Sequence, residues 1–157
     1  GLGKSIRKIP GQEKAVLLVT ANVTSWNKID IPLDFTEVEL KSFVLEQAGH
    51  HSLDTDSPIV FILQGRFDDL DLHVINGVNK KFDGHGGKEP FFQQHKTTRQ
   101  NQTATIVGFF SAKEQGIYTH PGDSWHMHAI LEKENISAHV DHFKVKKHTT
   151  LKLPKIQ

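Results

Sequence analysis

The 157-residue sequence contains no cysteine, which excludes disulfides, thiolate metal sites and cysteine nucleophiles. Histidine and carboxylate side chains are therefore the strong ligands that remain for a transition metal. The chain carries eleven histidines, an excess for its length. The absence of cysteine also favours an exported protein, periplasmic or secreted, slightly over a cytoplasmic one.

Long apolar runs and a charge of one sign are also missing. The longest apolar stretches, such as residues 15–19 and 59–63, are about five residues long, whereas a membrane span needs about twenty. The 19 basic and 18 acidic residues give a formal net charge of +1, without a basic run suited to phosphates. Neither a membrane nor a nucleic acid is expected as a partner.

The length fits a single domain that can bury its own core. Residues 1–14 mix glycine, proline and basic residues without periodicity, so we expect an N-terminal arm there and one domain over residues 15–157. The chain starts at Gly1 without an apolar signal core, which is typical of a processed or trimmed chain.

Alternating apolar residues predict a protein made mostly of strands. One helix is predicted from Thr36, a suitable cap, to a stop at Gly49. Tight turns are predicted at Gly65 and at residues 133–135, and loops over 25–32 and 76–102. The predicted strands are 15–23, 58–64, 67–75, 103–110, 125–131 and 136–145. The expected class is α+β, with a mixed, mostly antiparallel, twisted sheet or half-barrel and one main helix.

Three histidines are placed to meet on one face of this sheet. Side chains alternate along a strand, so His126 and His128 point the same way. A hairpin turn at residues 133–135 would bring His139 back opposite this pair. Three imidazoles leave a fourth position open, as in catalytic zinc sites, although a polar, solvated strand face would give the same pattern.

The other histidines carry weaker signals. His142 lies three residues after His139, so it faces away unless a bulge brings it round. The remaining ones follow the helix end or lie in polar segments, where we expect most of them to be solvated. They are His50, His51, His85, His95, His120 and His148.

Residues 105–143, TIVGFFSAKEQGIYTHPGDSWHMHAILEKENISAHVDHF, resemble the acetolactate decarboxylase family. Its members show a GTIVGF strand, a Pro-Gly turn, an H-x-H pair and a GGHV segment. Their last histidine follows the second by eleven residues, the separation of His128 and His139 here. The helix TEVELKSFVLEQ and the segment SPIVFILQGRFDDLDLHV extend the resemblance over about residues 14–145.

The resemblance implies a function as well as a fold. In this family the three histidines hold zinc, which implies the same role for His126, His128 and His139, with another divalent transition metal left open. It implies a carboxy-lyase acting on a small 2-hydroxy-3-oxo acid or similar anion. A zinc-dependent hydrolase, a non-catalytic metal or small-ligand module and a homodimer stay open, because zinc can also activate water and a fold does not fix an activity.

Departures from the family pattern bear on the chemistry. The family's catalytic arginine aligns with His73, so a permanent cation is replaced by a titratable one. Two family glutamates, from an N-terminal segment and a C-terminal tail, have no counterpart in the sequence. Two extra residues separate Pro121-Gly122 from the first of the three histidines. We therefore expect a pocket of different shape.

Four further side chains are candidates for catalysis or support. His73 shares one strand face with Asp71, so it is a candidate acid or carboxylate binder and Asp71 a candidate orienter of a metal-bound histidine. Glu132 continues the alternation from His126 and His128, and Asp141 continues that from His139. Either carboxylate could be a fourth ligand or a partner of one, while a solvated face is the simpler alternative for Asp71.

Overall fold

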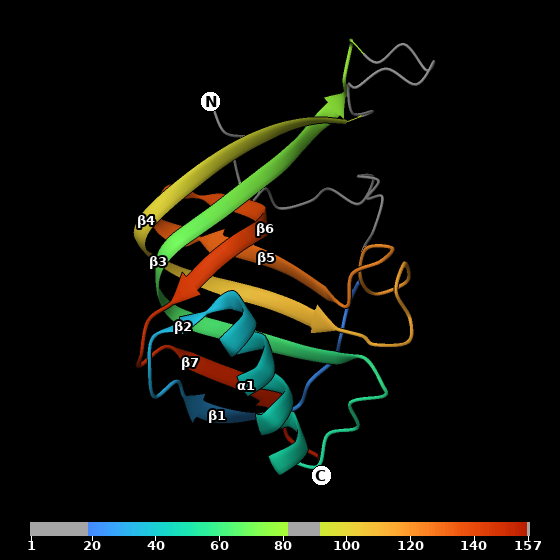
Figure 1. Cartoon of the computed structure of the whole chain (residues 1–157), viewed down its shortest axis with the longest axis vertical. Coiled ribbons are helices and arrows are strands. Elements are labelled where there is room, and N and C mark those ends of the chain that lie inside the picture. The colour runs from blue at the N-terminus through green and yellow to red at the C-terminus, as the bar shows by residue number, and fades with distance from the viewer. Residues whose placement is uncertain (1–18, 82–91, 157) are drawn as a thin grey trace.

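The computed structural model describes residues 19–81 and 92–156. These form seven strands, one α-helix and one 3-10 turn (Figure 1). Their bounds are β1 Trp26–Asp30, β2 Phe35–Thr36, α1 Glu37–His50, β3 Ile59–Val78, β4 Phe92–Phe110, β5 Trp125–Leu131, η1 Glu132–Glu134, β6 Ile136–Val145 and β7 Thr150–Pro154. Every pairing between these strands is antiparallel, which confirms the predicted α+β class.

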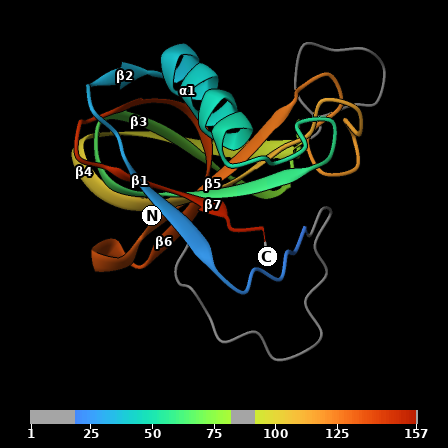
Figure 2. The same cartoon turned by 90° about the horizontal axis from the view of Figure 1, so that it is seen from below.

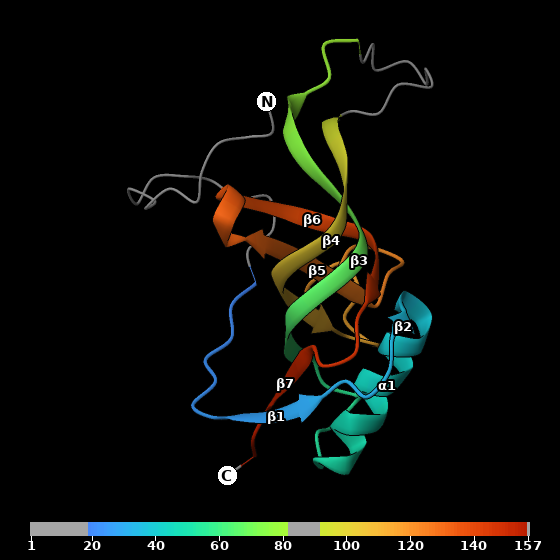
Figure 3. The same cartoon turned by 90° about the vertical axis from the view of Figure 1, so that its left-hand side faces the viewer.

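The sheet closes on itself through its longest strand. The strand order is β1-β7-β3-β4-β5-β6-β2, and β6 also pairs with β3. The first half of β3 pairs with β7 and its second half, from Phe67 to His73, pairs with β6. Two register shifts interrupt this second pairing, as expected where a strand bends. Strands β3 and β4 consequently curve together past β5 and β6 (Figure 3).

Helix α1 covers the apolar side of the sheet (Figure 2). It buries Leu40, Val44 and Ala48 against the core. The Thr36 hydroxyl accepts from the Glu39 backbone N–H while the Glu39 carboxylate accepts from the Thr36 backbone N–H, so a capping box starts the helix as predicted. The described part of the chain contains no candidate membrane-spanning helix.

The predicted turn at Gly65 is wrong, because β3 runs straight through this residue and pairs it with Ala104. The glycine serves close packing instead. A Cβ atom on Gly65 would lie 2.3 Å from the Thr149 Oγ1 atom and 2.7 Å from its Cα atom. The Thr149 hydroxyl in turn accepts a hydrogen bond from the Arg66 backbone N–H at 3.2 Å. A missing side chain here allows β3 to approach the segment that leads into β7.

The predicted N-terminal strand fails over its described residues, and a C-terminal strand that was not predicted is present. Residues 19–23 lie outside any strand, residues 15–18 lie outside the described part of the chain, and so does the predicted arm over 1–14. The predicted loop at 25–32 contains β1, which pairs with the unpredicted β7. Both strands are short, and their pairing joins residues more than a hundred positions apart. Local sequence patterns carry little information about such a pairing.

The predicted loop over residues 76–102 is too long. Strand β4 begins at Phe92, and its polar first half pairs with the second half of β3, for example Lys96 with His73. Most side chains from residue 93 to 100 are exposed, so the apolar alternation that marks a half-buried strand is absent there. Residues 82–91 lie outside the described part of the chain.

Candidate metal centre

The hairpin of β5 and β6 forms where it was predicted. Both strands have the predicted bounds, and η1 followed by Asn135 connects them. Asn135 takes a left-handed conformation with φ of 55°, which asparagine tolerates better than most residues. The register pairs His128 with His139. Met127 and Ala129 are buried in the core, so His126 and His128 project from the opposite face of β5.

Strand β3 adds a further imidazole to this face. The register of β3 and β6 pairs His73 with His139, so three histidines from neighbouring strands form a row. The ring centroids of His73 and His139 are 4.6 Å apart, and those of His128 and His139 are 5.3 Å apart. Closure of the sheet therefore brings the strand that carries His73 to the two predicted metal-binding strands.

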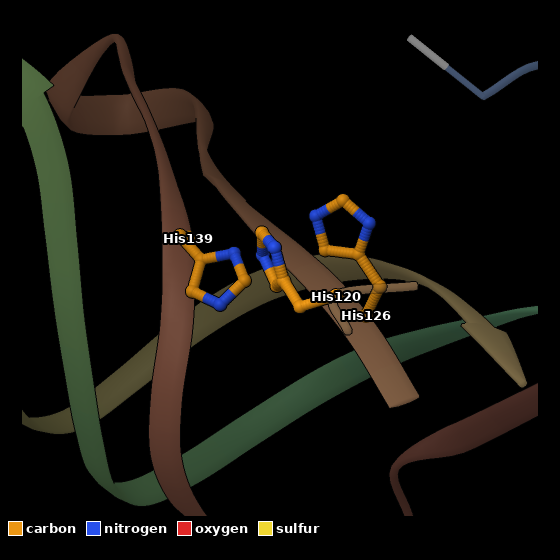
Figure 4. A group of neighbouring side chains, drawn as sticks. All are labelled: His120, His126 and His139. Atoms are coloured by element: carbon orange, nitrogen blue, oxygen red, sulfur yellow. The ribbon is translucent and has the colours of Figure 1, made fainter. Parts of the chain in front are cut away.

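The loop between β4 and β5 contributes His120. Its ring centroid lies 4.7 Å from that of His126 and 5.0 Å from that of His139. One ring nitrogen from each of His120, His126 and His139 lies within 4.8 Å of the others (Figure 4). The His120 side chain is exposed, as expected for a polar loop, but its ring also contacts those of two of the predicted metal ligands. The alternation of side chains along strands could not predict the position of His120, because side chains in a loop do not alternate between two faces.

His128 joins the same cluster through His126. The Nε2 atoms of His126 and His128 are 3.0 Å apart. The Nδ1 atom of His126 lies 3.4 Å from the Tyr118 carbonyl oxygen, which can only accept a hydrogen bond. The proton of a neutral His126 ring therefore belongs on Nδ1, and its Nε2 lone pair faces the cluster. We use the name "histidine cluster" for His73, His120, His126, His128 and His139.

Packing keeps the central rings neutral. Burial, followed by the neighbouring imidazoles, lowers the pKa of His139 to about 3. The His128 side chain is exposed, yet loss of water among its packed neighbours lowers its pKa to about 4. Burial and the nearby His120 also lower the pKa of His126. Neutral imidazoles are the form that binds a metal ion, so the cluster is ready to ligate at neutral pH.

Acidification should destabilise the metal-free protein through these same rings. His128 and His139 titrate near 6.5 in the unfolded chain and near 4 and 3 when folded. Between these values the unfolded state binds more protons, so the stability present above pH 6.5 is lost as the pH falls toward the folded pKa values. Melting temperatures measured with a chelator from pH 7.5 to 4 should show this fall, and His139→Ala should flatten it. Superimposable profiles for the two proteins would contradict the prediction.

The carboxylate of Asp141 contacts His73 of the histidine cluster. The His73 Nδ1 atom lies 2.7 Å from Asp141 Oδ1. The carboxylate of Asp71 instead accepts a hydrogen bond from the Thr98 hydroxyl at 2.5 Å, on the β3–β4 ribbon. Asp71, the candidate orienter of a metal-bound histidine, is thus hydrogen-bonded to Thr98, whereas Asp141, a candidate fourth ligand or partner of a ligand, contacts His73.

Glu132 lies outside the strand alternation that was expected to place it. Strand β5 ends at Leu131, and Glu132 begins the 3-10 turn with an exposed side chain. His142 is directed elsewhere, since its Nδ1 atom lies 3.1 Å from the Glu37 carboxylate on α1. The structure thus brings together His73, His126, His128, His139 and Asp141 and adds His120. Asp71 is bonded to Thr98, His142 is paired with Glu37, and Glu132 is exposed in the 3-10 turn.

The closed antiparallel sheet and its histidine cluster define an α+β protein with a candidate metal centre. Comparison with known proteins gives the family. The sequence matches the model of the alpha-acetolactate decarboxylase family over residues 3–157, and the chain belongs to this family. No curated protein matches it.

Solved structures share the fold at low sequence identity. Acetolactate decarboxylase from Bacillus subtilis subspecies spizizenii superposes with a TM-score of 0.61 at 18% identity, over 87% of this chain and 54% of that one. The enzyme from Bacillus subtilis strain 168 gives 0.61 at 20%, over 86% and 53%. A Staphylococcus aureus protein of unknown function, similar to alpha-acetolactate decarboxylase, gives 0.56 at 15%, over 89% and 55%. This chain therefore spans about half the length of the structures it resembles.

Proposed function

We propose that this protein binds a divalent metal ion, with zinc as the first candidate, through His126, His128 and His139. The convergence of neutral imidazoles from β5 and β6 carries the proposal. The donor set fits zinc, which takes histidine nitrogens at about 2.0–2.1 Å. Two such ligands on a tetrahedral ion lie about 3.3 Å apart, close to the 3.0 Å between the Nε2 atoms of His126 and His128.

We further propose that the metal serves a carboxy-lyase acting on a small 2-hydroxy-3-oxo acid. A bound zinc would supply Lewis-acid polarisation of the substrate oxygens. The proposal is supported by the family to which the chain belongs and by the pairing of His73 with Asp141. The Asp141 carboxylate accepts from Nδ1 of His73, so in the protonated ring Nε2–H is the group that would give its proton to the carbanion left by carbon dioxide, and the ring would become neutral. When protonated, the same ring is a cation that holds a substrate carboxylate.

A non-catalytic metal or small-ligand module is the second candidate function. One observation favours it: His73 stands where the family pattern has an arginine, so the permanent positive charge is absent from this position. A zinc-dependent hydrolase would use the same ligand set to activate a water molecule.

Turnover of acetolactate by the purified protein separates these functions. The lyase requires carbon dioxide release that stops on chelation and returns when zinc is restored. His73→Ala should lower the rate by about 10²- to 10⁴-fold, the usual contribution of a positioned acid. His142→Ala, a histidine outside the cluster, should keep the wild-type rate. Bound metal without turnover would support the binding module, and a protein that takes up no metal would contradict both functions.

A further inference from the structure

The loop that carries His120 is held in place on both sides. Its ends are joined by a hydrogen bond from the Ser111 N–H to the Ser124 carbonyl at 2.9 Å. Thr119 is buried, and its hydroxyl donates to the Asp123 carbonyl at 2.5 Å. The Asp123 N–H donates to the His120 carbonyl at 3.0 Å. These contacts fix the backbone of His120 while its side chain remains exposed next to the strand histidines.

His120 approaches the strand histidines as a ligand would. Its donor nitrogen forms a group with those of His126 and His139 in which every separation is at most 4.8 Å. Two ligands of one zinc ion must come to about 3.3 Å, so small side-chain rotations suffice to bind a common ion. His126 belongs both to this group and to the 3.0 Å pair with His128. The two sets therefore have the His126 ring in common.

We propose that His120 is a fourth protein ligand of this metal site, which then holds its ion through four imidazoles. The inference rests on the proposed metal binding by His126, His128 and His139. Four-coordinate tetrahedral geometry is what zinc adopts when protein ligands fill every position. Three of these ligands stand on strands, whereas His120 stands on a loop. A bound His120 would fill the fourth position, so a substrate would have to displace it or raise the coordination number of the ion to five.

The alternative for His120 is a purely packing role. Imidazoles that contact one another at centroid distances of 4.7–5.0 Å can form a hydrogen-bonded stack without sharing an ion. The two roles differ in the number of imidazoles around a bound metal and in metal affinity. A stacking residue would alter neither number nor affinity when it is removed.

The test compares zinc-loaded wild-type protein with His120→Ala, His120→Asp and His50→Ala. Zinc affinity is measured by competition with a chromophoric chelator, and the imidazole count by X-ray absorption. His120→Ala should lower affinity at least about tenfold, the loss that even indirect partners of a metal site cause, and reduce the count from four to three. His120→Asp, which keeps a ligand, should recover much of the affinity. His50→Ala changes an exposed residue of α1 and should leave the zinc affinity and the imidazole count unchanged.

The outcomes distinguish a failure of this inference from a failure of the proposed metal binding on which it rests. Wild-type affinity with an unchanged imidazole count in His120→Ala would overturn the role of His120 alone, provided that His128→Ala still loses the metal. Failure of the wild-type protein to take up zinc would overturn both. Circular dichroism checks that each variant is folded. If His120→Ala is unfolded, the imidazole count of the zinc-loaded wild-type protein decides, and a count of three imidazoles would refute the fourth ligand.

Discussion

Replacing His139 with alanine is expected to lower bound zinc from about one ion per chain to nearly none. His139 lies at the centre of the histidine cluster, and its ring contacts those of His73, His120, His126 and His128 at centroid distances of 4.6–5.3 Å. Its loss removes the ligand that β6 contributes. Affinity should fall by more than the 10- to 100-fold that indirect partners cause.

His142 provides a matched control on the same strand. It lies three residues from His139, and its ring pairs with Glu37 on α1 instead of the cluster. Metal analysis after removal of free zinc should give wild-type content for His142→Ala. Wild-type zinc content in both His139→Ala and His142→Ala would show that the cluster is not the metal site. Equal loss in both would instead point to general damage to β6.

The local part of the site was predictable from the sequence. Alternation alone places His126 and His128 on one face, and the turn at residues 133–135 sets the return of β6. Both features depend on residues close together in the chain. A one-residue slip would send His139 to the other face, so the buried Ala138 and Val140 fix the register that the spacing suggested.

The long-range part of the site was not predictable. His73 reaches His139 because β3 is one long strand that pairs with β6 after a bend, whereas the glycine at position 65 suggested a turn. The bend comes from two register shifts, and no local pattern marks them. His120 depends on a loop whose shape is set by its own hydrogen bonds and by buried Thr119. The first half of β4 consists mainly of exposed polar residues, so its sequence showed no strand pattern and was predicted as a loop.

Replacing Phe67 with alanine is expected to cost about 3–5 kcal/mol of unfolding free energy, the usual range for a large buried aromatic side chain. Phe67 is 0% exposed and lies on β3, where the pairing with β6 begins opposite Val145. Its ring packs edge-on against Phe143 with centroids 6.2 Å apart. Urea unfolding with an unchanged m-value measures the loss. Ile75→Ala, a half-exposed position farther along the same strand, should cost far less.

Zinc should distinguish this folding defect from a defect of the site. A ligand that binds only the native state stabilises it by about 2.7 kcal/mol at one hundred times its dissociation constant. Phe67 projects into the core, on the face opposite to the histidines, so its removal leaves every imidazole in place. Saturating zinc should therefore raise the melting temperature of Phe67→Ala much as it raises that of wild type, and leave His139→Ala unchanged. If Phe67→Ala remains folded but zinc does not raise its melting temperature, the core packing beneath β3 must set the positions of the ligands themselves.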